Sequence, residues 1–453
     1  MKKNVTATNG KTNVIAIITM FFLFAMISFV TNLAAPIGTI WKGHYAWAGM
    51  IGNFMNFLAY LFMGIPAGNM LVKYGYKKTT LIALAVGAIG IIIQYLSGIL
   101  GAETATFTVE GEPVMLNYLI YLLGAFISGF CVCMLNTVVN PMLNLLGGGG
   151  TKGNQLLQAG GSFNSLSGTL TPFFVGMLVG TVTANTSMAD VNVLLWIACA
   201  IFVLSFLIIS FVNIPEPQQN KVGEKPKFTH SPWNFRHTVL GVIGIFFYVG
   251  TEVGIPGVLI FYLSSPELGL ENGVAIGGGI AAVYWLLMLV GRISSSAISG
   301  FVSSRTQLIV TSVTAIVLVI LAICISADVR ISMPSYSVED GFSMAQVPIK
   351  ALFLVLCGLC TSVMWGGIFN LAVEGLGKYT AQASGIFMMM VVGGGVMPRI
   401  QESIGRNVGW MVSYWLVVAM LAYILFYAVI GSKNVNKDIP VDEEDLNTIP
   451  DAL

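Results

Sequence analysis

Uncharged amide side chains recur at helical spacing inside an apolar part of the sequence. In MLNTVVNPMLNLL, residues 134–146, Asn136, Asn140 and Asn144 follow one another at intervals of four residues, so in a helix they share one face. An amide facing lipid is costly, whereas one facing a wet cavity can donate and accept hydrogen bonds. Because an anion would favour arginine and a cation would favour a carboxylate, the pattern predicts a site for a small neutral sugar.

Other apolar segments carry further amides. The predicted sugar contacts among them are Gln158, Asn164 and Asn370, and the remaining ones are Asn32, Asn53, Asn56, Gln382 and Gln401. The alternative for each amide is a hydrogen bond that joins two helices, worth about 0.6 kcal/mol in membrane bundles. The sugar-site hypothesis would fail if Asn136, Asn140 and Asn164 were all bonded to adjacent backbone with no hollow between the helices.

Aromatic side chains in the middle of apolar segments are candidates for stacking on a sugar ring. Tyr248, Tyr284, Trp285 and Trp365 lie away from the membrane interfaces where tryptophan usually gathers. Core packing is the alternative for each ring. Trp285 and Trp365 are the two predicted to contact the sugar.

Glu252 is the acid that lies deepest in an apolar segment. It follows Arg236 by 16 residues, or about 24 Å of helix. An intramembrane carboxylate is a functional candidate. It is predicted to carry a proton or bind sugar, to pair with a structural partner such as Arg399, or to lie less deep than expected.

Four charged residues near the ends of apolar segments are interpreted as gate or loop contacts. They are Lys73, Arg292, Arg305 and Glu374. Arg399 directly follows Pro398, so it is expected to pair with an acid or to bond backbone freed by the proline.

The composition places these residues in a membrane. Of 453 residues, 56% are hydrophobic and only 9% are charged, against about 25% charged residues in soluble domains. Apolar runs of membrane length predict an all-α membrane protein with about twelve transmembrane helices. They lie at 13–40, 46–72, 79–101, 115–146, 154–182, 191–213, 236–263, 273–302, 306–327, 350–376, 379–405 and 408–431.

Charge and repeats divide the chain into two six-helix bundles. Basic residues concentrate in alternate loops, which predicts that both termini are cytoplasmic. Residues 1–213 and 236–431 form the expected bundles, 214–235 a cytoplasmic linker, and 432–453 a disordered acidic tail. Lys152 precedes Pro172 by twenty residues, as Lys378 precedes Pro398. Paired halves with interrupted helices are typical of alternating-access transporters.

Several other classes are disfavoured. The net charge of +1 gives no footprint for nucleic acid, and the six cysteines fall in apolar runs without a histidine nearby. No motif for acyl, phosphoryl or metal chemistry occurs, so we expect a transporter rather than an enzyme, with no metal and no cofactor. A sensor would need an added signalling domain, and a drug exporter would need a cavity with few amides.

Several motifs resemble those of a known family. GNMLVKYGYKK at 68–78 is similar to the loop motif of the major facilitator superfamily, although Val72 replaces its aspartate and Tyr76 its arginine. NPMLNLLG, FNSLSGTLTP, FFYVGTEVGIPGVLIFYL, GRISS and VVGGGVMPRIQ together resemble the fucose:proton symporter family, which includes the L-fucose permeases and glucose/galactose transporters. This resemblance implies the twelve-helix, two-bundle fold and proton-driven uptake of a monosaccharide, with Asn164 as a sugar contact.

The chain departs from that family at acidic positions. Asn136 stands where the permeases carry a glutamate, Ala35 stands where they carry an aspartate, and Gly161 replaces a glutamine. Proton coupling is therefore the expectation from the resemblance, and facilitative or sodium-coupled transport is the alternative. We expect a multi-pass protein of the cytoplasmic (inner) membrane that works as a monomer in the lipid bilayer.

Overall fold

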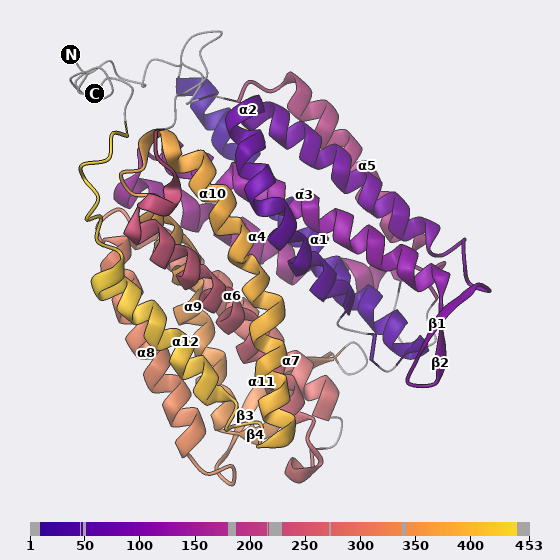
Figure 1. Ribbon diagram of the computed structural model, residues 1–453. Helices are drawn as coiled ribbons and strands as arrows, with labels where there is room; N and C mark the ends of the chain where they lie inside the picture. The colour runs from indigo at the N-terminus through magenta and orange to yellow at the C-terminus, as the bar shows by residue number, and fades with distance from the viewer. Residues whose placement is uncertain are drawn as a thin grey trace.

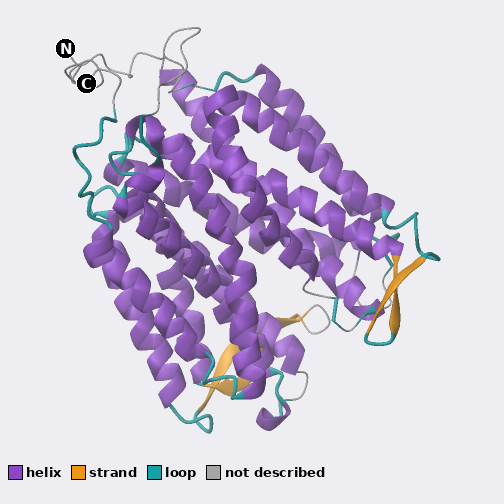
Figure 2. Ribbon diagram, in the orientation of Figure 1, coloured by secondary structure: helices purple, strands orange, loops and turns teal. Residues whose placement is uncertain are grey.

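The computed structural model describes residues 10–45, 47–48, 51–179, 187–214, 216, 229–270, 273–337 and 341–441. Long helices pack side by side, and two short β-hairpins project from them (Figures 1 and 2). The helices are α1 Gly10–His44, α2 Ile51–Leu96, α3 Leu116–Leu146, α4 Gly150–Val179, α5 Asn192–Phe211, α6 Arg236–Leu263, α7 Gly273–Ile298, α8 Ser304–Cys324, α9 Lys350–Ala372, α10 Thr380–Met389, α11 Gly393–Asn407 and α12 Tyr414–Phe426. The strands are β1 Ala105–Val109, β2 Glu112–Met115, β3 Arg330–Ser337 and β4 Gly341–Pro348.

Within the described ranges, ten helical segments are long and apolar enough to cross a membrane. The continuous segment Gly377–Asn407, which joins α10 to α11, counts as one of them. α4 is not among the ten; in its residues 150–171, amides, serines and glycines dilute the apolar side chains. α2 counts once although its 46 residues would extend about 69 Å, roughly twice a bilayer core. Gly75, with φ 80° and ψ 177°, interrupts α2 between the two predicted spans.

The two hairpins mark one end of the molecule. β1 pairs with β2 between α2 and α3, and β3 pairs with β4 between α8 and α9. Both lie in the lower part of Figure 1, whereas the described residues that lead into α6 lie at the top. We call these two ends the hairpin end and the linker end. The membrane-length segments are all helical, as predicted, and the two hairpins lie in connections for which no strands were predicted.

A run of glycines forms the turn between α3 and α4 at the linker end. Gly148, Gly149 and Gly150 all have positive φ angles, of 78°, 71° and 55°. Side chains with a Cβ rarely adopt this conformation, so three successive residues of this kind favour glycine. The glycines therefore allow a tight turn between α3 and α4.

The two halves, α1–α5 and α6–α12, repeat one contact. Lys77 Nζ, beyond the Gly75 break in α2, donates to Ser210 O at the end of α5 (2.7 Å). Arg305 Nε, at the start of α8, donates to Ala428 O just beyond α12 (2.9 Å). In each half, a basic residue at the start of one helix thus binds carbonyl groups at the end of that half's last helix, as expected of internal repeats.

Residues of the linker and tail pack on the linker end. Glu216 accepts hydrogen bonds from the backbone N–H groups of Tyr76 (2.7 Å) and Lys77 (2.9 Å). Burial raises the pKa of Glu216, while these two bonds oppose the rise. Val441 O, in the tail, accepts a hydrogen bond from the backbone N–H group of Lys378 before α10 (3.2 Å). Disorder was expected from residue 432, but residues 432–441 are ordered, and the remainder of the tail lies outside the described residues.

Candidate functional site

Arg292 joins the two halves through hydrogen bonds to both. Its Nη1 donates to Gly161 O (3.0 Å) and Ser165 Oγ (2.8 Å) on α4, and lies 3.4 Å from Asn164 Oδ1. Its Nη2 lies 3.1 Å from Glu252 Oε1 on α6. The two charged side chains are only 9% and 14% exposed. Removing one partner of such a buried pair is strongly destabilising, because the remaining charge is left without compensation.

Arg399, which was suggested as one structural partner for Glu252, is not bonded to it, because Glu252 pairs with Arg292. Arg399 Nη1 binds Glu402 Oε2 at 2.9 Å, and its side chain is 76% exposed. Pro398 and Arg399 lie near the middle of α11, and the arginine side chain is turned outward. The interpretation of Arg292 as a contact near a helix end was incomplete, because its long side chain reaches from α7 to both α4 and α6.

Asn164 lies at the contact between α1 and α4. Its Nδ2 donates to Phe24 O (3.1 Å), and Ser167 Oγ donates to Ala25 O (2.7 Å). Asn164 is half-buried, and so is Ser165 beside it. Both side chains are hydrogen-bonded, and neither residue is fully buried.

The face of α7 that carries Arg292 is uncovered near the hairpin end. Trp285 precedes Arg292 by seven residues, so it lies on the same face, about 10 Å nearer the hairpin end. Towards the linker end this face is covered by α4, because Ser296 Oγ donates to Gln155 O (3.1 Å). Trp285 itself is 38% exposed. The hydrogen bonds between the halves thus lie at Arg292 and on its linker side, while Trp285 lies on its hairpin side with a partly exposed ring.

Most of the predicted sugar-binding amides join the two halves instead of facing open space. Asn140 Oδ1 accepts from Trp365 Nε1 (2.9 Å), Asn144 Nδ2 donates to Asn370 Oδ1 (2.6 Å), and Gln158 Nε2 donates to Val363 O (2.9 Å). All four amide side chains are buried. In this conformation they follow the alternative interpretation, in which amides fasten helices.

Asn136 is bonded within the N-terminal half. Its Nδ2 donates to Tyr60 Oη (2.8 Å) and to Val132 O (3.2 Å). Asn140 Nδ2 likewise donates to Asn136 O (2.8 Å). The amide nitrogens of Asn136, Asn140 and Asn164 are thus all bonded to backbone. The first condition under which the sugar-site hypothesis would fail is thus met. The hypothesis now depends on open space beside Trp285, which is 38% exposed, and Asn164, which is half-buried.

The aromatic candidates differ in whether they lie near the Arg292–Glu252 pair. Trp365 is half-buried, and its ring centroid lies 6.2 Å from that of Tyr248. Tyr248 Oη donates to Glu252 Oε1 (2.7 Å). Tyr284 is buried, and its Oη lies 2.8 Å from Thr361 Oγ1. Trp365 and Tyr248 therefore border the Arg292–Glu252 pair, while Tyr284 is a packing residue of the C-terminal half.

The other three gate candidates bind locally at the linker end. Lys73 is exposed, with its ammonium 5.1 Å from the centre of the Tyr74 ring. Arg305 binds the carbonyls beyond α12, including Val429 O. Glu374 is exposed, and its backbone oxygen lies 3.0 Å from His237 Nε2. Of the four candidates, Arg292 is the one that bridges the halves in the described structure.

Sequence reasoning missed Ser165, Asn154 and Ser299. Asn154 Nδ2 donates to Ser299 Oγ (3.0 Å) across the halves. A signal was available, because Ser299 follows Arg292 by seven residues and therefore shares its helix face. Asn154 similarly precedes Gln158 by one helical turn.

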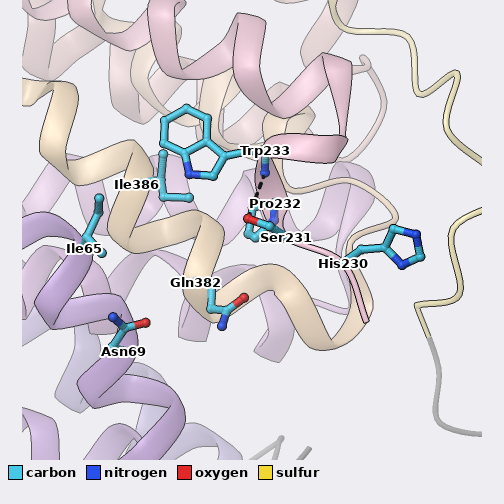
Figure 3. A pocket seen from close by; sticks show the side chains of 8 residues that line it. All are labelled: Ile65, Asn69, His230, Ser231, Pro232, Trp233, Gln382 and Ile386. Carbon is cyan, nitrogen blue, oxygen red and sulfur yellow. Dashed lines mark hydrogen bonds between the residues drawn. The ribbon is translucent and has the colours of Figure 1, made fainter. Parts of the chain in front are cut away.

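A separate cavity of about 200 Å³ lies at the linker end (Figure 3). It is lined by Ile65 and Asn69 of α2, by residues 230–233, and by Gln382 and Ile386 of α10. Both halves and the segment before α6 therefore contribute to it. It contains none of the residues around Arg292, so it is distinct from the polar site between the halves.

The chain is similar to known proteins over most of its length. Residues 15–398 match the family model described as Major Facilitator Superfamily. The chain is 29% identical to a glucose/galactose transporter of Brucella abortus, which covers 92% of this chain and 93% of that one. It is 22% identical to the L-fucose-proton symporter of Escherichia coli, over 90% of each chain. These matches confirm the resemblance noted from the motifs.

A solved structure agrees with the fold. The crystal structure of the Escherichia coli fucose:proton symporter matches with a TM-score of 0.75 at 20% identity, and the match covers 93% of this chain and 100% of that one. At this identity the match shows the fold. The prediction of a transporter rather than an enzyme is supported by the names of these relatives.

Proposed function

Since the chain belongs to the Major Facilitator Superfamily, whose model matches residues 15–398, we propose that it imports a small neutral monosaccharide by alternating access between its two halves. The observation that carries the proposal is the polar site around Arg292, where both halves contribute side chains. Asn164 and Ser165 come from α4, and Glu252 and Trp285 from the C-terminal half. The printed names of the relatives, which are glucose/galactose and fucose transporters, support the substrate class.

The chemistry of the site favours an uncharged, hydroxylated substrate. Asn164 and Ser165 offer donors and acceptors, and the exposed ring of Trp285 can stack on the apolar face of a sugar. Arg292 and Glu252 neutralise each other, so the site carries no net charge. We propose Asn164 and Trp285 as direct contacts. Asn136, Asn140, Gln158, Trp365 and Asn370 can contact the sugar only in a state in which their present hydrogen bonds are broken.

The conformation fits an outward-facing state. The bonds between the halves cluster on the linker side of Arg292, and within the described residues no hydrogen bond joins the halves near the hairpin end. We place the linker end in the cytoplasm because the lysine-rich loops gather there. Ten segments were counted above, with α2 as one span and without α4. Counting α2 as two spans and adding α4 gives the twelve spans that we propose for the cytoplasmic membrane. We propose that it works there as a monomer.

Glu252 is the proposed site of proton coupling. The family's two acids correspond here to Asn136, which is buried and bonded to Tyr60, and to Ala35, whose side chain lies outside the described residues. Glu252 is the carboxylate that contacts Arg292 between the halves. An intramembrane carboxylate at such a position is suited to taking up and releasing a proton. Facilitative or sodium-coupled transport remains the alternative.

Uptake into proteoliposomes tests the proposal. Labelled fucose, glucose, galactose and N-acetylglucosamine are supplied in turn, with an imposed pH gradient and then an imposed sodium gradient. We expect one of these sugars to accumulate when the outside is acidic. Accumulation with the sodium gradient alone would select the alternative, and no uptake of any sugar under either gradient would overturn the proposal.

A further inference from the structure

The fixed charges next to Asn164 form one isolated pair. Arg292 and Glu252 are in contact there, while the other ion pairs of the described residues involve Glu402 on α11. Glu402 binds Arg399 and Arg406 on its own helix. Only the Arg292–Glu252 pair therefore sets the charge next to the proposed sugar contacts.

The two terminal nitrogens of the Arg292 guanidinium bind residues of different halves. Nη1 binds acceptors of α4, which are Gly161 O and Ser165 Oγ, and Nη2 binds Glu252 Oε1. Glu252 Oε1 also accepts from Tyr248 Oη. The second oxygen, Oε2, accepts no hydrogen bond from the described residues and is not fully buried. The carboxylate thus cancels the arginine's charge and has one oxygen without a hydrogen-bond partner among the described residues.

We infer that Glu252 selects the charge of the substrate by neutralising Arg292, so that the site takes neutral monosaccharides and rejects sugar acids. Arginine binds carboxylates strongly through two parallel hydrogen bonds. In the protein, Glu252 is the anionic partner of Arg292, through the bond from Nη2 to Oε1. A hexuronate, which is a sugar with a carboxylate, would therefore bring a second anion to a guanidinium already paired. This inference rests on the proposed function and adds the rule by which substrates are chosen.

The inference predicts that removal of the carboxylate alone changes the preferred substrate. In Glu252→Gln, Arg292 keeps its bonds to α4 but loses its anionic partner. A buried cation without a counterion favours an anionic ligand. Glucuronate and galacturonate should then bind at least about tenfold more tightly than in the natural protein, because a hydrogen bond to a charged group is worth more than a neutral one.

The double variant Glu252→Gln with Arg292→Gln tests whether the arginine is responsible. It removes both charges, so the site is again neutral and the gain in hexuronate binding should disappear. Glu402→Gln is the matched control, because Glu402 is the other poorly exposed carboxylate bound to arginine in the described spans. It should leave the preference for neutral sugars unchanged.

Equilibrium binding of labelled glucose, galactose, glucuronate and galacturonate to the purified full chain decides the matter, with a melting temperature recorded for each variant. A gain of hexuronate binding in Glu252→Gln that the double variant loses supports the inference. A folded Glu252→Gln protein with no such gain overturns it while the proposed function stands. If Glu252→Gln does not fold, the double variant must bind neutral sugars and not hexuronates, and the reverse overturns the inference. Failure of the natural protein to bind any neutral monosaccharide would overturn the proposed function as well.

Discussion

Asn144 and Asn370 occupy equivalent positions in the two halves and bind each other across the interface. Asn144 lies two residues before the end of α3, and Asn370 lies two residues before the end of α9. Asn144 Nδ2 donates to Asn370 Oδ1 at 2.6 Å, and Asn370 Nδ2 donates to Ser304 Oγ at 2.8 Å. A contact between repeat-related residues lies close to the axis that relates the halves. It must break when the linker end opens.

Loss of the Asn144–Asn370 bond should favour opening of the linker end. Asn144→Ala and Asn370→Ala should each shift the ratio of outward-facing to inward-facing molecules by roughly threefold, or about 0.6 kcal/mol. The double variant should shift it no further, since one bond is removed in both cases. The measurement is the distribution of distances between spin labels at Phe107→Cys and Met344→Cys, which lie on the two hairpins and are exposed.

The exposed Cys324 would be replaced by serine in this background. Ser304→Ala is the control, because it removes a bond within the C-terminal half and leaves Asn144 bound to Asn370. Purely additive effects of the two asparagine variants would show that they act separately.

The sequence predicted the helices well and their partners poorly. The span expected at 115–146 is observed at Leu116–Leu146, and the common face of Asn136, Asn140 and Asn144 follows from helical periodicity. What lies opposite that face depends on contacts with residues more than two hundred positions away, such as Trp365 and Asn370. A pattern within one helix carries no information on such partners.

The same limit explains why Arg399, and not Arg292, was suggested as a structural partner of Glu252. Residue counts estimate the depth of Glu252 along α6. They do not decide whether Arg292 or Arg399 is its partner. The direction of each arginine depends on how α7 and α11 pack. The first hairpin had a local signal, because Glu110 and Gly111, both with positive φ (53° and 86°), form the β1–β2 turn directly after the β-branched residues Thr108 and Val109.

Asn164→Ala should strongly reduce uptake without loss of folded protein. The change removes the bond to Phe24 O and the acceptor beside Arg292. We expect the rate of sugar uptake at low concentration to fall at least about tenfold. Ser167→Ala is the matched control, since Ser167 also binds α1 backbone but does not contact Arg292. Normal transport by Asn164→Ala in proteoliposomes would remove Asn164 from the site.

Glu252→Gln should prevent accumulation against a gradient and spare exchange. Glutamine cannot carry the proton, but exchange of sugar across the membrane needs no net proton movement. Breaking the buried pair should also lower stability by about 3–5 kcal/mol, because Arg292 loses its counterion. Counterflow and gradient-driven uptake are measured on the same vesicles, with Glu402→Gln as control. A variant that still concentrates sugar would refute coupling through this carboxylate.

Gly64→Ala should hold the linker end partly open. A Cβ on Gly64 would lie 2.6 Å from Met389 N and 2.7 Å from Gly385 O, which are backbone atoms of α10. These atoms cannot move aside as a flexible side chain would, so α2 and α10 must separate at a cost of about 1–3 kcal/mol. Since α2 and α10 belong to different halves, the separation acts on the interface that closes in the outward-facing state.

Spin labels at Tyr74→Cys and Val435→Cys report this separation, since both positions are exposed and lie at the linker end in different halves. We expect a longer mean distance in Gly64→Ala than in the natural protein. Gly257→Ala in α6 is the matched control, because no atom lies within 4 Å of its added Cβ. Alanine there should keep the distance unchanged and favour the helix slightly. An unchanged distance in Gly64→Ala at normal thermal stability would show that the α2–α10 contact does not set the closed state of the linker end.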